Sequence, residues 1–287
     1  MIVLKNVLKD CHRPMLVLVV ALVFWGIPSV AVGEMVISGE RTYDRHNRDG
    51  DNFFANEFDW SGVCTNSDRR AIMISDSYFI TAYHYRPGTG SSLNFVTSSG
   101  QTKTYSVDSY TSRITTTYTY EGEEYTRNSD LALGKLTSKV AADIAKYPIA
   151  SDGLITTSET LYLYGKSNYV GTNQADTLEL TYAGPEGSTL ESSEEDIDVG
   201  ISLWMGYEVS ASDDEAYLNS EDSSSPTFAV RNGQLILVGT HWLVTKLTGN
   251  PSSTDSSIDT YIPYYAQDII DRMVGESPTF FPVPEPS

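Results

Sequence analysis

The chain is poor in basic residues. Its 287 residues include 19 Lys and Arg against 38 Asp and Glu, which gives a net charge of −19 at pH 7. A surface this acidic repels the phosphate backbone of DNA and RNA and favours solubility. The composition therefore argues against nucleic acid as a partner.

Long apolar runs are also missing, apart from one near the N-terminus. Lys5, Lys9 and Arg13 precede the run Met15–Trp25, which small residues follow. This order is typical of a secretory signal peptide, and the run is shorter than the ~20 apolar residues that a membrane-spanning helix needs. We expect residues 1–33 to be a cleaved signal peptide, with an uncleaved membrane anchor as the alternative.

Only two cysteines are present, and Cys11 lies in the predicted signal peptide. Cleavage would leave Cys64 without a partner, which excludes an intrachain disulfide. A secreted fold of about 250 residues must then be held together by its apolar core, and this length is enough to bury a sizeable one. We expect Cys64 itself to be a buried small hydrophobe.

The acidic residues form no recognisable calcium-binding loop. If Gly50 is taken as the glycine of an EF-hand, Arg45 falls at the first ligand position and Asn56 falls where a bidentate Glu is required. The acidic segments 191–198 and 213–215 are interpreted as solvated loops, with calcium binding as the alternative. No metal site and no other cofactor is predicted.

Helical periodicity is rare, and short β-rich runs separated by turn residues dominate. Thr and Tyr alternate over 114–120, and Asn232-Gly233 separates two apolar runs as in a two-residue hairpin. One helix is expected over 262–274, ended by Gly275. These patterns predict an all-β fold with a short C-terminal helix. The expected strands are 71–74, 78–82, 93–96, 102–107, 112–120, 161–164, 177–182 and 235–238.

Turn residues around 147–154 separate two β-rich halves. We place an N-terminal unit at 34–150 and a C-terminal unit at 151–275, followed by a Pro-rich tail at 276–287 that we expect to be disordered. Ligand sites often lie at the interface between two such units. A site assembled from residues of both halves is therefore expected in the cleft between them.

Three short segments, far apart in the chain, carry the groups of a nucleophilic active site. A hydroxyl becomes a useful nucleophile at neutral pH when an imidazole accepts its proton and a buried carboxylate fixes the tautomer of that imidazole. His84, Asp130 and Ser223 supply these groups in this order, at intervals of 46 and 93 residues. The segments are Thr81-Ala82-Tyr83-His84, Asp130-Leu131-Ala132-Leu133 and Glu221-Asp222-Ser223-Ser224-Ser225-Pro226.

These segments resemble the T-A-A-H-C, D-[IL]-A-L and G-D-S-G-G-P motifs of the chymotrypsin/trypsin-like serine proteases, and the resemblance spans most of the mature chain. It implies two six-stranded antiparallel β-barrels and an endopeptidase that works through an acyl-enzyme without a cofactor. His84 would act as general base and then as general acid, and Asp130 would orient its ring. The frame Asp-Ser-x-x-Pro selects Ser223 as the nucleophile. The N–H groups of Glu221 and Ser223 would form the oxyanion hole.

Three glycines of the family's serine motif are replaced here, by Glu221, Ser224 and Ser225. Glycine adopts a positive φ at little cost, whereas Glu in such a conformation is strained. Either the loop adopts a different backbone, or the site is inactive and the protein is an extracellular binding module. Hydrolysis of small acyl esters is a third alternative. A family disulfide is also absent, because Tyr85 stands in place of one of its cysteines.

The resemblance also implies a substrate pocket. Its floor would be Tyr217 and its wall His241, Trp242 and Leu243, with no carboxylate at the floor to bind a basic side chain. Because Leu243 replaces a glycine, we expect a shallow apolar pocket. This predicts cleavage of a polypeptide substrate after small or medium apolar residues, and not after Lys or Arg.

Asp222 matches the family Asp that pairs with a new N-terminus after activation. Val36-Ile37-Ser38-Gly39 is similar to the stretch that supplies this N-terminus. We expect Glu34 and Met35 to be trimmed so that the ammonium group of Val36 pairs with Asp222, with an ordinary first strand as the alternative.

The last residues carry a second resemblance. Val283-Pro284-Glu285-Pro286 is similar to the V-P-E-P element of bacterial exosortase sorting signals. This predicts association with the cell surface through the tail, with a plain Pro-rich tail as the alternative. Together with the signal peptide, it indicates a secreted or cell-surface bacterial protein.

Overall fold

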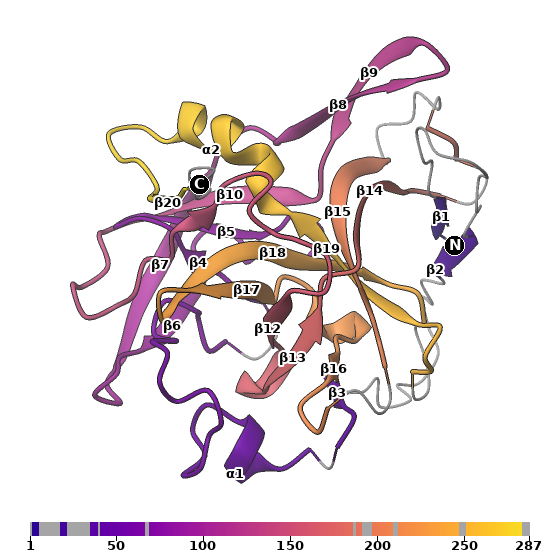
Figure 1. Ribbon diagram of the computed structural model, residues 1–287. Coiled ribbons are helices and arrows are strands. Elements are labelled where there is room, and N and C mark those ends of the chain that lie inside the picture. The colour runs from indigo at the N-terminus through magenta and orange to yellow at the C-terminus, as the bar shows by residue number, and fades with distance from the viewer. Residues whose placement is uncertain are drawn as a thin grey trace, which may run out of the picture.

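A computed structural model describes residues 2–5, 18–21, 35–39, 41–66, 69–185, 188–190, 197–208, 212–246 and 251–282. The fold is mostly β with a short C-terminal helix, as the sequence predicts (Figure 1). The V-P-E-P element and most of the predicted signal peptide lie outside the described residues, so both stay predictions.

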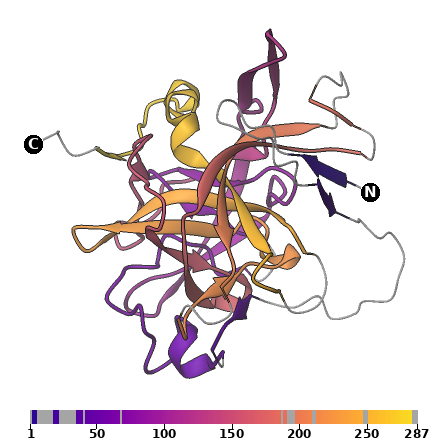
Figure 2. The ribbon, with the colours of Figure 1, turned by 45° about the vertical axis from the view of Figure 1, so that its right-hand side comes forward.

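Two large sheets form the body of the protein (Figures 1 and 2). The five-stranded sheet has the order β4 (Ile72–Met73), β5 (Tyr78–Ala82), β10 (Leu131–Leu136), β7 (Thr102–Tyr110) and β6 (Ser92–Val96). The eleven-stranded sheet has the order β13 (Val170–Gln174), β12 (Thr160–Tyr164), β17 (Pro226–Arg231), β18 (Gln234–Val244), β19 (Ser256–Tyr261), β15 (Asp198–Gly206), β9 (Glu123–Asn128) and β8 (Thr115–Tyr120), with β11 (Ile149–Ala150), β14 (Thr177–Ala183) and β20 (Phe280–Phe281) paired off this path.

Two small sheets pair β1 (Ile2–Lys5) with β2 (Leu18–Ala21) and β3 (Val36–Ile37) with β16 (Ala216–Tyr217). The helices are α1 (Tyr43–His46) and α2 (Ala266–Arg272), with 3-10 turns at Lys166–Asn168, Ser220–Asp222 and Ile262–Tyr265. Both large sheets are open at their edges within the described ranges, so closed barrels are not seen in this part of the chain.

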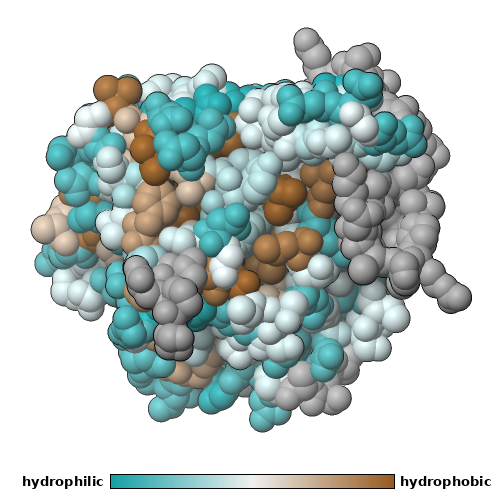
Figure 3. All heavy atoms as spheres, turned by 45° about the horizontal axis from the view of Figure 1, so that its top comes forward, coloured by the Kyte–Doolittle hydropathy of each residue, from teal (hydrophilic) through white to brown (hydrophobic). Residues whose placement is uncertain are grey.

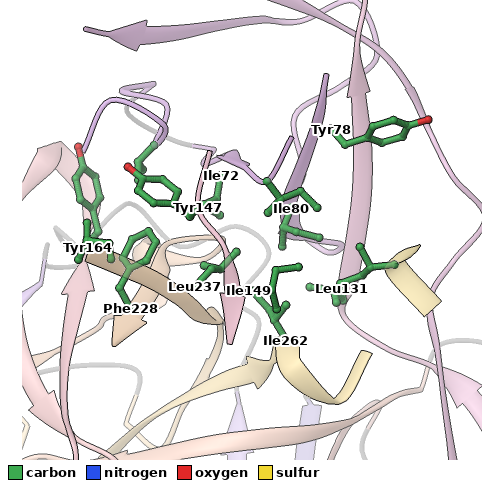
Figure 4. Close-up of a cluster of buried hydrophobic side chains, with 14 of the residues drawn as sticks. Ile72, Tyr78, Ile80, Leu131, Tyr147, Ile149, Tyr164, Phe228, Leu237 and Ile262 are labelled. Carbon is green, nitrogen blue, oxygen red and sulfur yellow. The ribbon is translucent and has the colours of Figure 1, made fainter. Parts of the chain in front are cut away.

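The largest apolar core joins the two large sheets. Ile72, Ile80 and Leu131 from the smaller sheet belong to the same buried cluster as Phe228 and Leu237 from the larger one (Figure 4). Burying each such side chain contributes about 1.5–3 kcal/mol. This core therefore holds together the strand ends that carry the candidate site.

The predicted hairpin and the predicted helix both form. Arg231 pairs with Gln234 across the turn, and φ is 52° at Asn232 and 74° at Gly233, the two positive values that a type I′ turn requires. The expected helix starts as a 3-10 turn at Ile262–Tyr265 and continues as α2. Its residue Ile269 is fully buried, which anchors the helix on the core.

The division into two halves is less clean than the sequence suggests. β8 and β9 lie in the N-terminal half, yet Asn128 of β9 pairs with Asp198 of β15 in the larger sheet. Both ribbon views show this hairpin projecting away from the body (Figures 1 and 2). The boundary expected near 147–154 therefore does not separate the strands by sheet.

The expectation of a disordered tail is wrong for residues 276–282. The Glu276 carboxylate accepts hydrogen bonds from the Ser75 hydroxyl at 2.7 Å and from the Ser77 N–H at 3.0 Å. Farther on, β20 pairs in parallel with β11. The tail is ordered here because unpaired backbone groups of β11 offer it a strand partner.

The surface is mainly polar. Figure 3 shows one face on which hydrophilic atoms predominate and apolar patches are scattered among them. In the part of the chain that the structure describes, no helix has the length and apolar character needed to cross a bilayer.

Candidate active site

The register of two strands brings His84 and Asp130 together. β5 and β10 pair antiparallel, with Ala82 opposite Leu131, so the residue after β5 and the residue before β10 lie at the same end of the ladder. The Tyr83 N–H extends this pairing by donating to the Asp130 carbonyl at 2.8 Å. His84 and Asp130, 46 positions apart in the sequence, are thus brought back into contact by the pairing of the two strands.

The Asp130 carboxylate holds His84 through two hydrogen bonds. One oxygen accepts from the His84 backbone N–H at 2.8 Å, and the other lies 2.7 Å from Nδ1 of the ring. The Asp130 side chain is fully buried, whereas 39% of the His84 side chain is exposed. A carboxylate at Nδ1 keeps the proton on that nitrogen and leaves Nε2 free to accept one.

Ser223 lies on the other side of the imidazole. Its Oγ is 2.9 Å from Nε2 of His84, and the serine directly follows the 3-10 turn Ser220–Asp222. Among the described residues, neither Ser224 nor Ser225 forms a hydrogen bond with the ring: the Ser224 Oγ donates to the Tyr85 carbonyl at 3.4 Å, and the Ser225 Oγ is buried without a hydrogen-bond partner. Of the three consecutive serines, the structure brings Ser223 to the histidine.

The electrostatics of the His84 ring reflect two opposing effects. Burial by itself lowers the pKa of His84, but the negative charge of Asp130 and its hydrogen bond outweigh burial. The pKa of His84 therefore lies above its ordinary value of 6.5. A raised pKa strengthens the imidazole as a proton acceptor.

The predicted oxyanion hole has a different backbone from the one the sequence implies. Glu221 lies within the 3-10 turn Ser220–Asp222, and the positive φ occurs instead at Ser224, at 71°. The cause is a capping box, in which Asn219 accepts at one end of the turn and the Asp222 side chain accepts from the Asn219 N–H at 2.7 Å. Glu221 therefore avoids the strained conformation.

This turn directs a carbonyl toward the nucleophile. The Ser223 Oγ lies 3.1 Å from the Ser220 carbonyl oxygen as well as 2.9 Å from His84 Nε2. A hydroxyl carries one proton, so the two acceptors compete for it. Convergence of the Glu221 and Ser223 N–H groups on a substrate oxyanion requires the Ser220–Glu221 peptide to rotate, which would also remove the competing acceptor.

Asp222 and Val36, predicted to pair after activation, are not together in this structure. The Asp222 carboxylate accepts from the backbone N–H groups of Lys166, at 2.6 Å, and Asn219. Burial raises the pKa of Asp222, and these two N–H groups counteract the rise. Val36 pairs instead with Tyr217 as part of β3, the alternative considered from the sequence.

The four residues predicted to line a substrate pocket are largely interior. Tyr217 and His241 are each 1% exposed and Trp242 is 5% exposed, while Leu243 is half-buried. The Tyr217 hydroxyl donates to the Lys246 carbonyl, and His241 Nδ1 lies 3.1 Å from the fully buried Asp259. These contacts hold the side chains within the core, and their role in specificity stays a prediction.

Three further residues near the site were not found from the sequence. Arg113 donates to Asp198 at 2.5 Å and to the Ser129 carbonyl at 2.9 Å, directly beside Asp130 in the chain. Burial raises the pKa of Asp198 to about 7, the charge of Asp130 adds to the rise, and Arg113 opposes it. Lys166 forms an ion pair with Glu221. No local motif marks these residues, since contacts between segments far apart in the chain bring them to the site.

Neither a search for metal ligands nor comparison with known proteins assigns a further role to these residues. Among the described residues, no group of three or more His, Cys, Asp and Glu side chains is arranged to hold a metal ion. No protein-family model matches the chain, and no curated protein matches it.

Proposed function

We propose that the protein is an exported serine endopeptidase of the chymotrypsin/trypsin-like class. Ser223 attacks the scissile carbonyl while His84 takes its proton, and Asp130 holds the ring and stabilises the imidazolium that forms. His84 then protonates the leaving amine, and water hydrolyses the acyl-enzyme by the same route. The substrate is a polypeptide, cleaved after a small or medium apolar residue.

One observation carries this proposal, the continuous hydrogen-bonded relay from a buried carboxylate through an imidazole to a hydroxyl. Its two links are 2.7 Å, from Asp130 to Nδ1, and 2.9 Å, from Nε2 to Ser223, and the 2.8 Å hydrogen bond from the His84 backbone N–H holds the same carboxylate in place. A lone surface histidine would not combine a fully buried carboxylate with a serine at opposite ring nitrogens. The two-barrel architecture belongs to the same proposal and is supported by the two large sheets, which contribute His84 and Asp130 on one side and Ser223 on the other.

A second candidate, a binding module without turnover, is favoured by the Ser220 carbonyl. It lies 3.1 Å from the Ser223 Oγ, where it competes for the hydroxyl proton. If the turn does not open on substrate, the fold can bind a polypeptide without cleaving it. The two candidates differ in whether Ser223 reacts with an electrophile.

A fluorophosphonate probe separates these candidates. We expect the purified protein to form one covalent adduct, which peptide mass spectrometry assigns to Ser223, because this hydroxyl forms a hydrogen bond with the His84 ring. The matched control is Ser225→Ala, which removes a buried hydroxyl that has no hydrogen-bond partner among the described residues. Such a change is close to neutral, so labelling should persist. Absence of an adduct in the wild-type protein would favour the binding module.

The pH profile provides an independent check. The proton acceptor must be neutral, so kcat/KM should rise with pH as His84 loses its proton and then reach a plateau. Since the pKa of His84 is raised, the midpoint of this rise should lie above pH 6.5. Asp198→Asn should move the midpoint to lower pH, because the charge of Asp198 contributes to the rise. A midpoint at or below 6.5 in the wild-type protein would contradict this account of the site.

A further inference from the structure

A pocket adjoins the His84 imidazole, and its charge is opposite to that of the protein. It has a volume of about 660 Å³ and is lined by His84 together with Arg69, Arg86 and Arg113, and no Asp or Glu among the described residues lines it. The whole chain has twice as many acidic as basic residues. A lining with three arginines and no carboxylate is therefore a local reversal of the overall charge.

Two of these guanidinium groups are held in place by backbone carbonyls and aromatic rings. Arg86 donates to the Tyr83 carbonyl at 2.7 Å, and its guanidinium carbon lies 3.7 Å from the centre of the Tyr83 ring. Arg69 donates to the Arg86 carbonyl at 3.1 Å and lies over the Tyr85 ring. Neither arginine forms an ion pair with any residue in the described ranges. Both retain N–H donors that these contacts do not use.

Arg113 forms the opposite wall and differs from the other two. Its guanidinium carbon lies 3.6 Å from the Tyr83 ring centre. Two groups at such distances from one ring cannot share a face, so Arg86 and Arg113 stack on opposite faces of Tyr83. Arg113 lies 2.5 Å from the Asp198 carboxylate, with which it forms an ion pair. Of the three arginines in the lining, Arg69 and Arg86 are therefore the two without an ion-pair partner among the residues that the structure describes.

This arrangement suits a carboxylate. A guanidinium presents a planar fork of donors that matches the two oxygens of a carboxylate, and a side chain already held by stacking loses less freedom on binding. Charges beyond about 8 Å are largely screened at physiological salt, so the acidic surface elsewhere does not cancel the pocket. The pocket therefore acts at contact range, on a group that has already reached the site.

We propose that this pocket binds an acidic side chain of the substrate, an Asp or Glu within a few residues of the scissile bond. The inference rests on the proposed function, because a polypeptide bound for attack by Ser223 must pass the His84 ring that lines the pocket. It extends that function by assigning a preference for an acidic substrate residue, which the sequence did not reveal. This acidic residue is not the substrate residue that would fill the predicted apolar pocket.

The test uses peptide pairs that differ only by Glu or Gln, with the change moved through each position around the scissile bond. We expect one position at which Glu raises kcat/KM about tenfold over Gln, the scale of one charge-assisted contact. Arg86→Gln and Arg69→Gln should each reduce this ratio toward one, because the loss of kcat/KM falls mainly on the Glu peptide. Arg86→Lys, which keeps the charge but loses the fork, should give an intermediate ratio.

Lys139→Gln is the matched control. Lys139 is exposed, pairs with Asp76 and lies near the end of β5 opposite to His84. The Lys139→Gln substitution removes the same charge without changing the pocket, so the ratio of kcat/KM for the Glu and Gln peptides should stay as in the wild-type protein. If Lys139→Gln lost the Glu preference as fully as the arginine variants, the effect would come from net charge alone, and the inference would be overturned. Equal losses for the Glu and Gln peptides in the arginine variants would also overturn it.

A binding experiment separates this inference from the proposed function. Fluorescence anisotropy measures how tightly the same peptides bind to the full-length Ser223→Ala protein. A Glu preference that Arg86→Gln removes supports the pocket even where the wild-type protein shows no hydrolysis and no fluorophosphonate adduct. Equal binding of Glu and Gln peptides at every position overturns the pocket, even where the wild-type protein is an active peptidase.

Discussion

Replacing Ser223 with Ala is expected to lower kcat on a peptide substrate by about 10⁶-fold, the loss seen when a serine nucleophile is removed from such a triad. The hydroxyl contacts His84 Nε2 and the Ser220 carbonyl, and no other described group can take its place at the ring. The residual rate should come from binding and oxyanion stabilisation alone. A fluorogenic peptide assay with the wild-type protein as reference measures the change.

The fold of this variant should be retained. The lost hydrogen bonds are to a partly exposed ring and to one carbonyl, a change of about 1 kcal/mol in the free energy of unfolding. Thermal unfolding by circular dichroism checks this, and Ser225→Ala should retain full kcat in the same assay. Retention of more than a small fraction of kcat in Ser223→Ala would assign the nucleophile to another residue.

Replacing Asp130 with Asn is expected to reduce kcat by about 10⁴-fold. The amide can still accept from the His84 backbone N–H, so the segment keeps its geometry. Its NH₂ group, however, would face Nδ1 and require that nitrogen to accept a hydrogen bond. The ring proton would then be on Nε2, pointing at Ser223, and the imidazole could not take the serine proton.

The fluorophosphonate labelling rate should fall in parallel with kcat in Asp130→Asn, because both depend on activation of Ser223. Thermal unfolding shows whether the variant remains folded, since it loses a buried charge and gains an isosteric amide. A folded Asp130→Asn protein with kcat within tenfold of the wild-type value would show that Asp130 does not set the tautomer of His84.

Several features of the fold were predictable because they depend on neighbouring residues. Alternating side chains marked the strands, and Asn232-Gly233 marked the β17–β18 hairpin because few other pairs adopt two positive φ values. The apolar stripe around Ile269 marked the C-terminal helix. The tail was misjudged, since its pairing with β11 involves residues more than 120 positions away.

Some features of the candidate site were also predictable from the sequence, and others were not. His84, Asp130 and Ser223 were identifiable from their flanking residues and order, and the structure brings all three together. The conformation of the serine loop was not predictable, because it depends on a capping box between Asn219 and Asp222 and on the Lys166 N–H from a distant turn. Replacement of glycines indicated only that the backbone would differ.

The amino-acid sequence by itself determined which chemical groups are present, the β character of the chain and the acidity of its surface. The tertiary structure alone decided that the Ser220 carbonyl competes for the Ser223 proton and that Arg113 contacts Asp198 and the Ser129 carbonyl beside Asp130. It also decided that two arginines without an ion pair in the described part of the chain line a pocket beside His84. The physical reason is that side-chain identity and local propensity act over a few residues. Distances between functional groups instead depend on strand register and sheet packing, which join segments tens to hundreds of residues apart.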